Sequence, residues 1–376
     1  MATYLLDPDV CFLNHGSFGA TPKELIDAQH AMRIQMEREP VDFLAREIES
    51  RWQDSIAEVA RFLKSDPEGT VFVHNATSGV NAVIDSFPWQ PGDEILTTNH
   101  RYDAVRNTLD HMAQKVGATV VEAVVPFPIE TPEQIVDAIA KAITPQTRML
   151  VIDQITSPTA LHFPVHDIVR LAKKHGIATL IDGAHAPGQL DVDVTKLDPD
   201  FWVGNLHKWL CAPKGCAVLY VAKPWRKTIH PGTISHGYKK GLHAEFGWIG
   251  TADPTAWFCA PLAIELHQAQ GGAAFRAAHH ELVREGRSVI ANALGVELPH
   301  PDRPDLYGSM ATIPLPCPIE KGPELFDQLR HEDQIEVPII PWQNRLWVRI
   351  SGFAATNRPE QYQYLADCLA KRLIRG

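Results

Sequence analysis

Several features that define large classes of proteins are missing from this 376-residue sequence. No block of lysine and arginine occurs and acidic residues outnumber basic ones by 45 to 35, so we expect no binding to nucleic acids. No uninterrupted apolar stretch approaches the ~20 residues of a membrane-spanning helix. The first residues carry no basic segment followed by an apolar core. We therefore expect a cytoplasmic protein without membrane partners.

Cysteine is scarce, with six residues and no CxxC pair, so we expect reduced thiols rather than a disulfide framework. One group could in principle bind a metal: His185, His207, Cys211 and Cys216. Zinc sites usually contain tighter pairs of ligands, so a metal site is the weaker alternative. Neither GxGxxG nor GxxxxGK[ST] is present, and nucleotide binding is not predicted.

Short apolar runs alternate with helical periodicity through most of the chain. The strands expected from these runs are residues 71–73, 94–97, 119–125, 149–155, 178–181, 201–204 and 216–221, and the helices are residues 23–38, 42–63, 80–87, 103–116, 131–143 and 165–175. Helices of ten or more residues between most of these strands imply a mostly parallel sheet with helices on its faces.

The pattern changes after residue 222. Residues 231–254 have no clear periodicity, and a long irregular stretch of this kind is more often functional or interfacial than idle. The helices expected beyond it are residues 255–270, 273–294, 323–330 and 359–373, with strands at 310–315, 335–340 and 346–350. We expect a large α/β domain (21–273), a smaller C-terminal α+β domain (274–376), and an N-terminal segment (1–20) packed near the smaller domain.

Two strand ends carry residues suited to covalent chemistry. Asp182 ends one apolar run, and the next leads into Asn205-Leu206-His207-Lys208-Trp209. Ligands bind at such strand ends in α/β sheets. A lysine that forms an imine and a carboxylate that keeps a pyridine nitrogen protonated are what a pyridoxal phosphate enzyme requires. In isolation, a turn-capping Asp182 and a solvated Lys208 would be commoner.

Two small polar turns could face a ligand. HNATSG (residues 74–79) lies between a strand and a helix, where free N–H groups and a hydroxyl bind phosphate. The alternative is that Thr77 or Ser78 only caps the helix. NHGSFG (residues 14–19) is expected to be a flexible turn.

Six segments carry a resemblance to a known family: LNHGSFG, FVHNATSGVN, DQITSPTAL, LIDGAHAPG, GNLHKWL and RLWVRIS. In order and spacing they resemble the class V aminotransferases of fold-type I, and most of all the isopenicillin N epimerase-like branch. The resemblance spans nearly the whole chain. It implies a pyridoxal 5'-phosphate enzyme with a large, mostly parallel α/β/α domain and a smaller α+β domain.

The resemblance also implies roles for residues. Lys208 corresponds to the imine lysine, Asp182 to the partner of the pyridinium nitrogen, and His185 to the residue that hydrogen-bonds the phenolic oxygen. Tyr102 is our choice for the aromatic on the ring, with His100 close by. The remaining contacts implied on the cofactor are Ala76, Thr77, Ser157, Asn205 and His207; Ser157 stands where many relatives carry asparagine.

Arg349 lies in an otherwise apolar strand, where an arginine is costly unless it meets an anion. A salt bridge would satisfy it, but the resemblance implies that it binds the substrate carboxylate, with Asn14 and His15 over the substrate. Thr251 corresponds to a position that reaches the phosphate of a neighbouring subunit, which implies a homodimer. The residues expected near the entrance are His236, Tyr238 and His243.

The expected first step breaks the Cα–H bond of an amino acid, with Lys208 as the base. Overall resemblance favours an epimerase, ahead of a C–S lyase on a cysteine conjugate or an aminotransferase. Residues 334–349 contain no cysteine, so persulfide-forming desulfurase chemistry is not expected. Candidates for a second acid are Tyr102, His15, Tyr238 and His243. Alternatives from other classes are a metal-dependent hydrolase using Asp182, His185 and His207, and a binding protein without a cofactor.

Overall fold

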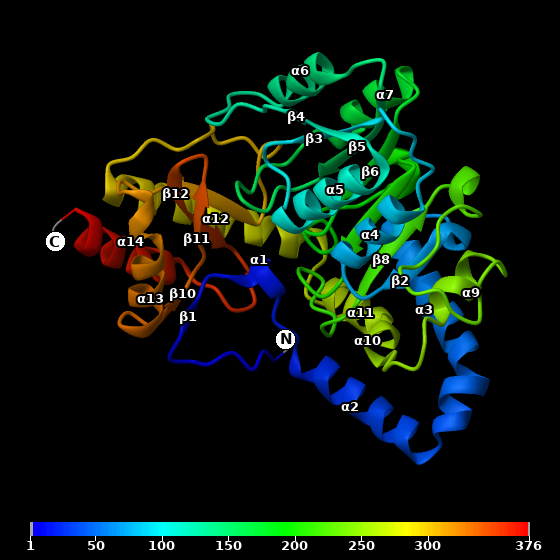
Figure 1. Cartoon of the computed structure of the whole chain (residues 1–376). Coiled ribbons are helices and arrows are strands. Elements are labelled where there is room, and N and C mark those ends of the chain that lie inside the picture. The colour runs from blue at the N-terminus through cyan, green and yellow to red at the C-terminus, as the bar shows by residue number, and fades with distance from the viewer. Residues whose placement is uncertain (1–2, 375–376) are drawn as a thin grey trace.

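A seven-stranded sheet forms the centre of the computed structural model, which describes residues 3–374 (Figure 1). Its order is β2-β8-β7-β6-β5-β3-β4. The strands are β2 Thr70–Val73, β3 Glu94–Thr98, β4 Thr119–Ala123, β5 Thr147–Asp153, β6 Ala178–Asp182, β7 Phe201–Asn205 and β8 Ala217–Val221. Only β8 is reversed within this sheet, because it pairs antiparallel with both β7 and β2. The prediction of a mostly parallel α/β sheet is confirmed.

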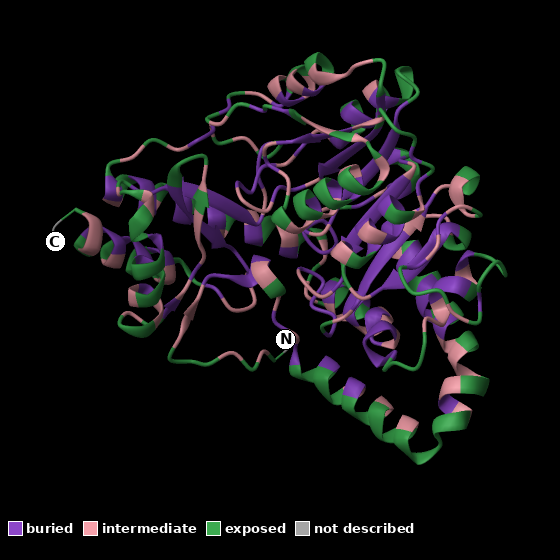
Figure 2. Ribbon diagram, viewed as in Figure 1, coloured by how far each residue is buried: buried purple, intermediate pink, exposed green. Residues whose placement is uncertain are grey.

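The strands are apolar because helices cover both faces of the sheet. Every residue of β2, β6 and β7 is buried, and Figure 2 shows this buried centre surrounded by helices whose outer faces are exposed. The covering helices are α4 Ala76–Ser86, α5 Asp103–Val116, α6 Glu133–Ala142, α7 Val165–Lys174 and the short α8 Val194–Leu197. A strand with two covered faces has no need of polar residues until it ends.

The N-terminal part of the chain runs along one side of the molecule. It comprises β1 Cys11–Phe12, α1 His15–Phe18, α2 Lys23–Arg38, a π-helix η1 Asp42–Glu47, α3 Ile48–Leu63 and the 3₁₀ turn η2 Pro67–Gly69. Helix α2 extends away from the body, and α3 returns to it (Figure 1). Of α2, only Leu25 and Gln29 are buried, and Ile34 remains 43% exposed.

Residues 14–19 were predicted to form a flexible turn, and this was wrong in part because α1 makes one helical turn there. Gly19 follows it with φ of 70°. A Cβ atom at Gly19 would lie 2.4 Å from the carbonyl oxygens of His207 and Lys208. The glycine is therefore needed for close approach to the backbone that carries the lysine.

The C-terminal part contains a second, smaller sheet. Strands β9 Met310–Pro314, β11 Ile339–Trp342 and β12 Arg345–Ser351 form an antiparallel sheet in the order β11-β12-β9, and β10 Ile335–Glu336 pairs with β1 in parallel. Of the other elements after β8, those that pack with the large sheet are η3 Lys223–Trp225, α9 Leu242–Gly247, α10 Thr255–Phe258 and α11 Ala260–Ala269. Those that accompany the small sheet are α12 Ala273–Leu294, η4 Ile319–Lys321, α13 Gly322–His331 and α14 Pro359–Leu373.

One strand expected at residues 335–340 is in fact two, since β10 and β11 pair with different partners. Pro338, which lacks an N–H donor, lies between them. The irregular residues 231–254 contain only the short helix α9.

Three clusters of buried apolar side chains support these elements. The largest surrounds the seven-stranded sheet, and the second lies between the small sheet, α12 and α14. The third joins the two halves and includes Trp209, Cys211, Phe275, Met310 and Phe353. Across residues 3–374, no helix combines the length and the apolar character that a membrane crossing requires.

Candidate active site

A cavity of about 500 Å³ lies where β2, β5, β6 and β7 end at the same edge of the large sheet. The strand directions explain this, because side chains that follow parallel strands gather at one edge. Nine of the residues expected at the cofactor line this cavity: Ala76, Thr77, Tyr102, Ser157, Asp182, His185, Asn205, His207 and Lys208.

Lys208 follows β7 and points its amine towards the loop after β6. Its Nζ lies 3.3 Å from His185 Nε2. Burial and the positive charge of Arg349 together lower the pKa of Lys208 to about 8, while Asp182 and Asp153 oppose the shift. The uncharged amine, which is the form that acts as a nucleophile or a base, is therefore far more populated near neutral pH than in an ordinary lysine.

His185 is held as a neutral donor beside this amine. The indole N–H of Trp209 donates to His185 Nδ1 at 3.3 Å, so the proton of the neutral ring lies on Nε2, facing Lys208. Burial holds the pKa of His185 well below its usual value, and the charges of Lys208 and Arg349 act in the same direction. The cavity thus receives an N–H donor that suits an anionic oxygen.

Two carboxylates form another part of the cavity wall. Asp182 ends β6, and its Oδ1 accepts a hydrogen bond from the Ala184 N–H at 2.9 Å. Asp153 ends β5 directly opposite Asp182 in the strand register, and it lines the same cavity. The sequence analysis missed Asp153, although it ends an apolar run just as Asp182 does.

The start of α4 is fixed by side chains on both sides. Asn205 Oδ1 accepts from the Ala76 N–H at 2.8 Å, and Asn75 Oδ1 accepts from the Ser78 N–H at 2.8 Å. The helix therefore begins at Ala76 rather than at residue 80, and Asn75, not a threonine or serine, caps it. Thr77 lies on the cavity at the positive end of the helix, where N–H groups favour phosphate.

His207 and Asn205 line the cavity and also form hydrogen bonds with backbone groups. His207 Nδ1 donates to the Cys216 carbonyl at 3.0 Å, and burial lowers the pKa of His207 to about 4. Its ring is therefore neutral, with Nε2 left for other contacts. Among residues 3–374, no group of three His, Cys, Asp or Glu side chains is arranged to hold a metal ion.

Arg349 lies on β12, behind the cavity wall. Its Nη1 donates to the carbonyl oxygen of Ser157 at 2.6 Å and to the Ser157 hydroxyl at 3.1 Å, and its Nη2 donates to Ser17 Oγ at 3.1 Å. Burial lowers the pKa of Arg349 to about 10. No carboxylate forms a salt bridge with it in the described part of the chain, so neutral oxygens occupy the fork that a carboxylate would bind.

Asn14 and His15 occupy different environments. Asn14 Oδ1 accepts from Ser17 Oγ at 2.5 Å, and its amide donates to Glu336 at 2.9 Å. His15 is fully buried and stacks on Phe353 with ring centroids 3.7 Å apart. Its Nε2 lies 3.2 Å from the Lys208 carbonyl, so His15 packs beneath the lysine backbone.

Tyr102 and His100, the two aromatic residues considered for contact with the cofactor ring, differ in their exposure. Tyr102 lines the cavity and is 45% exposed. His100 is fully buried, with Nδ1 2.7 Å from the Thr159 hydroxyl. Tyr102 is therefore the one of the two that has access to a ligand.

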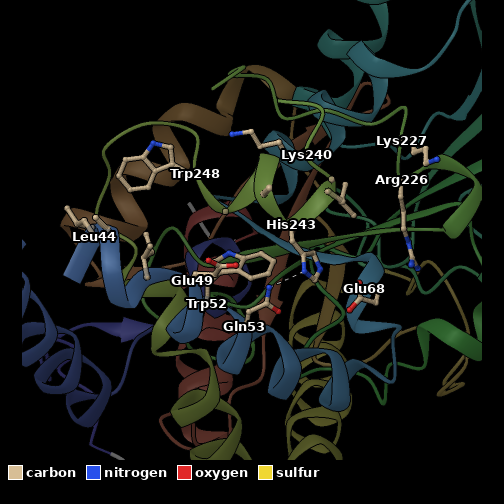
Figure 3. Close-up of a pocket in the computed structure, with 16 residues that line it drawn as sticks. Leu44, Glu49, Trp52, Gln53, Glu68, Arg226, Lys227, Lys240, His243 and Trp248 are labelled. Atoms are coloured by element: carbon tan, nitrogen blue, oxygen red, sulfur yellow. Dashed lines mark hydrogen bonds between the residues drawn. The ribbon is translucent and has the colours of Figure 1, made fainter. Parts of the chain in front are cut away.

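The candidate entrance residues lie elsewhere. His243 borders a second cavity of about 750 Å³, where it contacts Gln53 and faces Trp52 (Figure 3). His236 and Tyr238 are exposed on the irregular stretch before α9. Thr251 is exposed too, directly after Gly250 at φ of 116°.

Comparison with known proteins identifies the family. The model for class V aminotransferases matches residues 20–319. The chain belongs to the class V aminotransferase family. It is 32% identical to the putative L-cysteine desulfhydrase 1 of Oryza sativa subsp. japonica, over 98% of this chain and 84% of that protein. It is 31% identical to the isopenicillin N epimerase of Streptomyces clavuligerus, over 97% of this chain and 95% of that protein.

Solved structures share the fold of this class V aminotransferase-family chain. A mutant of C-DES with glycine covalently linked to its pyridoxal phosphate cofactor superposes with a TM-score of 0.80 at 21% identity, covering 96% of this chain and 97% of that one. The chain is a fold-type I enzyme that uses pyridoxal 5'-phosphate. The donor set fits this cofactor, since the cavity combines a buried amine, a carboxylate, a neutral histidine donor and a helix N-terminus.

The depressed pKa of Lys208 gives a first prediction. In the cofactor-free protein, the rate of cyanate modification of Lys208 is expected to rise with pH around a midpoint near 8, because the uncharged amine is the reactive form. In Arg349→Ala the midpoint is expected to move upward, since a nearby positive charge is removed. Mass spectrometry of the modified peptide measures both profiles. An ordinary lysine midpoint near 10.5 in the wild-type protein would contradict the assigned environment.

Proposed function

We propose that this enzyme binds an amino acid with a β-sulfur substituent, removes its α-proton and expels the sulfur group, as a C–S lyase. The observation that carries the proposal is the buried Lys208 amine beside neutral His185, in the cavity that Arg349 borders through Ser157. An amine that withdraws a proton and a guanidinium that binds a carboxylate are the two groups an α-amino acid requires.

Each side chain has a distinct task in this proposal. The bound cofactor supplies an electron-withdrawing ring that weakens the bonds at the substrate α-carbon. Lys208 holds the cofactor before the substrate arrives and accepts the α-proton afterwards. Asp182 would hold the ring nitrogen, His185 would donate its Nε2–H to the phenolic oxygen, and Thr77 would donate to the phosphate.

Arg349 is the proposed site for the substrate carboxylate. Its fork now contacts Ser157 and Ser17, both of which line the cavity, so a carboxylate can replace their hydroxyls without crossing the wall. Ser157 therefore belongs with the substrate arginine in this proposal, rather than with the phenolic oxygen. Asn14 supports Ser17 from behind.

The lyase is preferred to an epimerase because few acids reach the cavity. A two-base epimerase needs a second acid on the face opposite Lys208. Of the four candidates, Tyr102 lines the cavity. His15 is buried beneath Lys208, His243 borders another cavity, and Tyr238 is exposed on the irregular stretch before α9. Epimerisation remains the second candidate, with Tyr102 as that acid, and an isopenicillin N epimerase is among the relatives at similar identity. Transamination is the third possible outcome, and no specific contact favours it.

We also propose a homodimer in which Thr251 reaches the partner's phosphate. Thr251 is exposed on the irregular stretch, and its neighbour Ile249 lines a cavity of about 620 Å³ beside Thr77. Helix α2, which extends away from the body of the molecule (Figure 1), is a second reason to propose a dimer. Ile34 on α2 is 43% exposed and Val41 after it is 60% exposed, so this part of the chain would offer apolar surface to a second copy.

The reaction type can be read from products formed in deuterated water. With cysteine conjugates, we expect release of a thiol, pyruvate and ammonia, because loss of the α-proton is followed by loss of the β-substituent and water then hydrolyses the released enamine. Racemised substrate carrying deuterium at the α-carbon would instead establish the epimerase, and a keto acid that retains the side chain would establish an aminotransferase.

Lys208→Ala should lose turnover by roughly 10³-fold or more, as expected for loss of both nucleophile and base. Borohydride should fix the cofactor to the wild-type protein but not to this variant.

Replacement of the arginine tests how the substrate is bound. Arg349→Ala is expected to raise KM for the amino acid roughly 10- to 100-fold, because a charge-assisted hydrogen-bonded pair is lost. Arg345→Ala is the matched control, since that residue is an exposed arginine at the start of the same strand, and its KM should stay near the wild-type value. Steady-state kinetics measures both variants, and equal KM values in wild type and Arg349→Ala would place the carboxylate elsewhere.

Mixed dimers test the proposed role of Thr251. Thr251→Ala should weaken cofactor affinity severalfold through the loss of one phosphate contact. When it is mixed with Lys208→Ala chains, half of the sites combine an intact lysine with an intact threonine from the partner, and those sites should regain wild-type affinity. Absorbance titration of the purified mixed dimer measures this. If affinity stays low, Thr251 acts within its own chain or not at all.

A further inference from the structure

The C-terminal ends of β5 and β6 place two aspartates side by side. Asp153 and Asp182 are partners in the parallel register, and the Cα atoms of adjacent strands lie about 4.8 Å apart. Register partners project to the same face of a sheet, so the two carboxylates enter the cavity together. Both side chains are more than nine-tenths buried. Two carboxylates this close and this buried repel each other unless a proton or a cation lies between them.

The negative charge of the two aspartates is not balanced by the positive charges next to them. The cation that acts on both carboxylates is Lys208, and the other titratable groups that line the cavity are Tyr102, His185, His207 and Lys214. His185 is neutral, because its pKa is well below the usual value. Arg349 lies behind the cavity wall and acts on Lys208 rather than on the pair. When Lys208 is uncharged, as its nucleophilic role requires, the cation that acts on both carboxylates is lost. A positively charged ring in the cavity would balance the charges.

We propose that Asp153 forms with Asp182 a two-carboxylate site that faces the nitrogen end of the cofactor ring and stabilises its positive charge. On this ring, the carbon that bears the aldehyde lies opposite the nitrogen. Lys208 reaches the aldehyde carbon, and Asp182 marks the nitrogen end. The register partner of Asp182 therefore lies at the nitrogen end too, which makes Asp153 a positioning and charge-balancing residue rather than the acid that acts on the substrate. This inference rests on the proposed roles of Asp182 and Lys208.

Without the cofactor, the same pair should hold a proton. Burial raises the pKa of Asp153 well above its usual value, and the charge of Asp182 raises it further. Burial raises the pKa of Asp182 too, although the Ala184 N–H and Lys208 act in the opposite direction, so the proton is shared by the pair. A carboxyl whose pKa is raised in the folded state costs stability as pH rises above its unfolded value. The cofactor-free protein should therefore lose stability on the way from acidic to alkaline pH, in part because of Asp153.

The decisive variant is Asp153→Asn, which removes the charge and keeps an oxygen that can accept from the main-chain N–H groups of Ser157 and Tyr102. In cofactor-free protein, Asp153→Asn should be at least as stable as wild type at pH 8, measured by urea unfolding. Its dissociation constant for pyridoxal phosphate should nevertheless rise roughly tenfold, the equivalent of one pKa unit. The pH at which the visible absorbance of the bound cofactor titrates should fall, because an anion that stabilises the protonated form is gone.

Asp200→Asn is the matched control. Asp200 precedes β7 at the opposite end of the sheet, where it accepts hydrogen bonds from the Thr179 N–H at 2.9 Å and from the Trp225 indole at 2.8 Å. This variant should lose stability and keep wild-type cofactor affinity and absorbance titration. Asp153→Glu, which retains the charge, should keep the absorbance titration close to wild type. If Asp153→Asn does not fold, Asp153→Ser removes the charge in a smaller volume and carries the same measurements.

Two outcomes would overturn the proposal. One is an Asp153→Asn protein with wild-type cofactor affinity and absorbance titration. The other is a parallel loss of stability and affinity without a shift of the absorbance titration, which a purely structural aspartate would produce. The failure of the wider proposal has a different signature, since wild-type protein would then fail to fix the cofactor on Lys208 with borohydride. If borohydride fixes the cofactor on Lys208 of the wild type, and Asp153→Asn leaves cofactor affinity and absorbance titration unchanged, only the role proposed for Asp153 is disproved.

Discussion

The parallel pairing of β5, β6 and β7 is the constraint on which the site depends. It aligns Asp153 with Asp182 and Asp182 with Val203, so the chain beyond Val203 brings Lys208 to the edge where the carboxylates end. A shift of one residue would turn the aspartates into the apolar layer between sheet and helices, where their desolvation would oppose folding. The same burial that keeps the strands apolar thus fixes the register of the reactive groups.

Burial also sets the chemical state of those groups. Removal of water lowers the pKa of Lys208 and of His185 and raises that of Asp182, so each group moves towards its uncharged form. Arg349 disfavours the protonated form of Lys208 and so lowers its pKa, whereas Asp182 and Asp153 favour the protonated form and raise it. The amine can therefore exist in both forms near pH 8. The fold therefore adjusts the amine through a balance of charges from three strands rather than through one partner.

The sequence predicted the sheet and most of the cavity, and its failures have physical causes. Strands covered on both faces produce apolar runs, and a polar residue at the end of such a run is visible in the sequence, as Asp182 was. Asp153 carried the same signal and begins the segment DQITSPTAL, but the role inferred for that segment was assigned to Ser157. His15 could not be placed, because adjacency in sequence to Asn14 and Ser17 does not reveal that its ring turns towards Phe353. The capping of α4 by Asn75 was missed because threonine and serine in the same turn are equally good caps.

The N-terminal segment links the two halves of the site. Gly19 packs against the backbone of Lys208, His15 contacts the Lys208 carbonyl, and Ser17, between them, accepts from Arg349. One turn of helix therefore touches both the residue proposed to take the α-proton and the residue proposed to bind the carboxylate. Because a single turn is short and its glycine cannot accept a Cβ, the separation of amine and guanidinium has little freedom to vary. In the proposed reaction the substrate's α-carbon would lie between the two groups, so His15, Ser17 and Gly19 would help to position it.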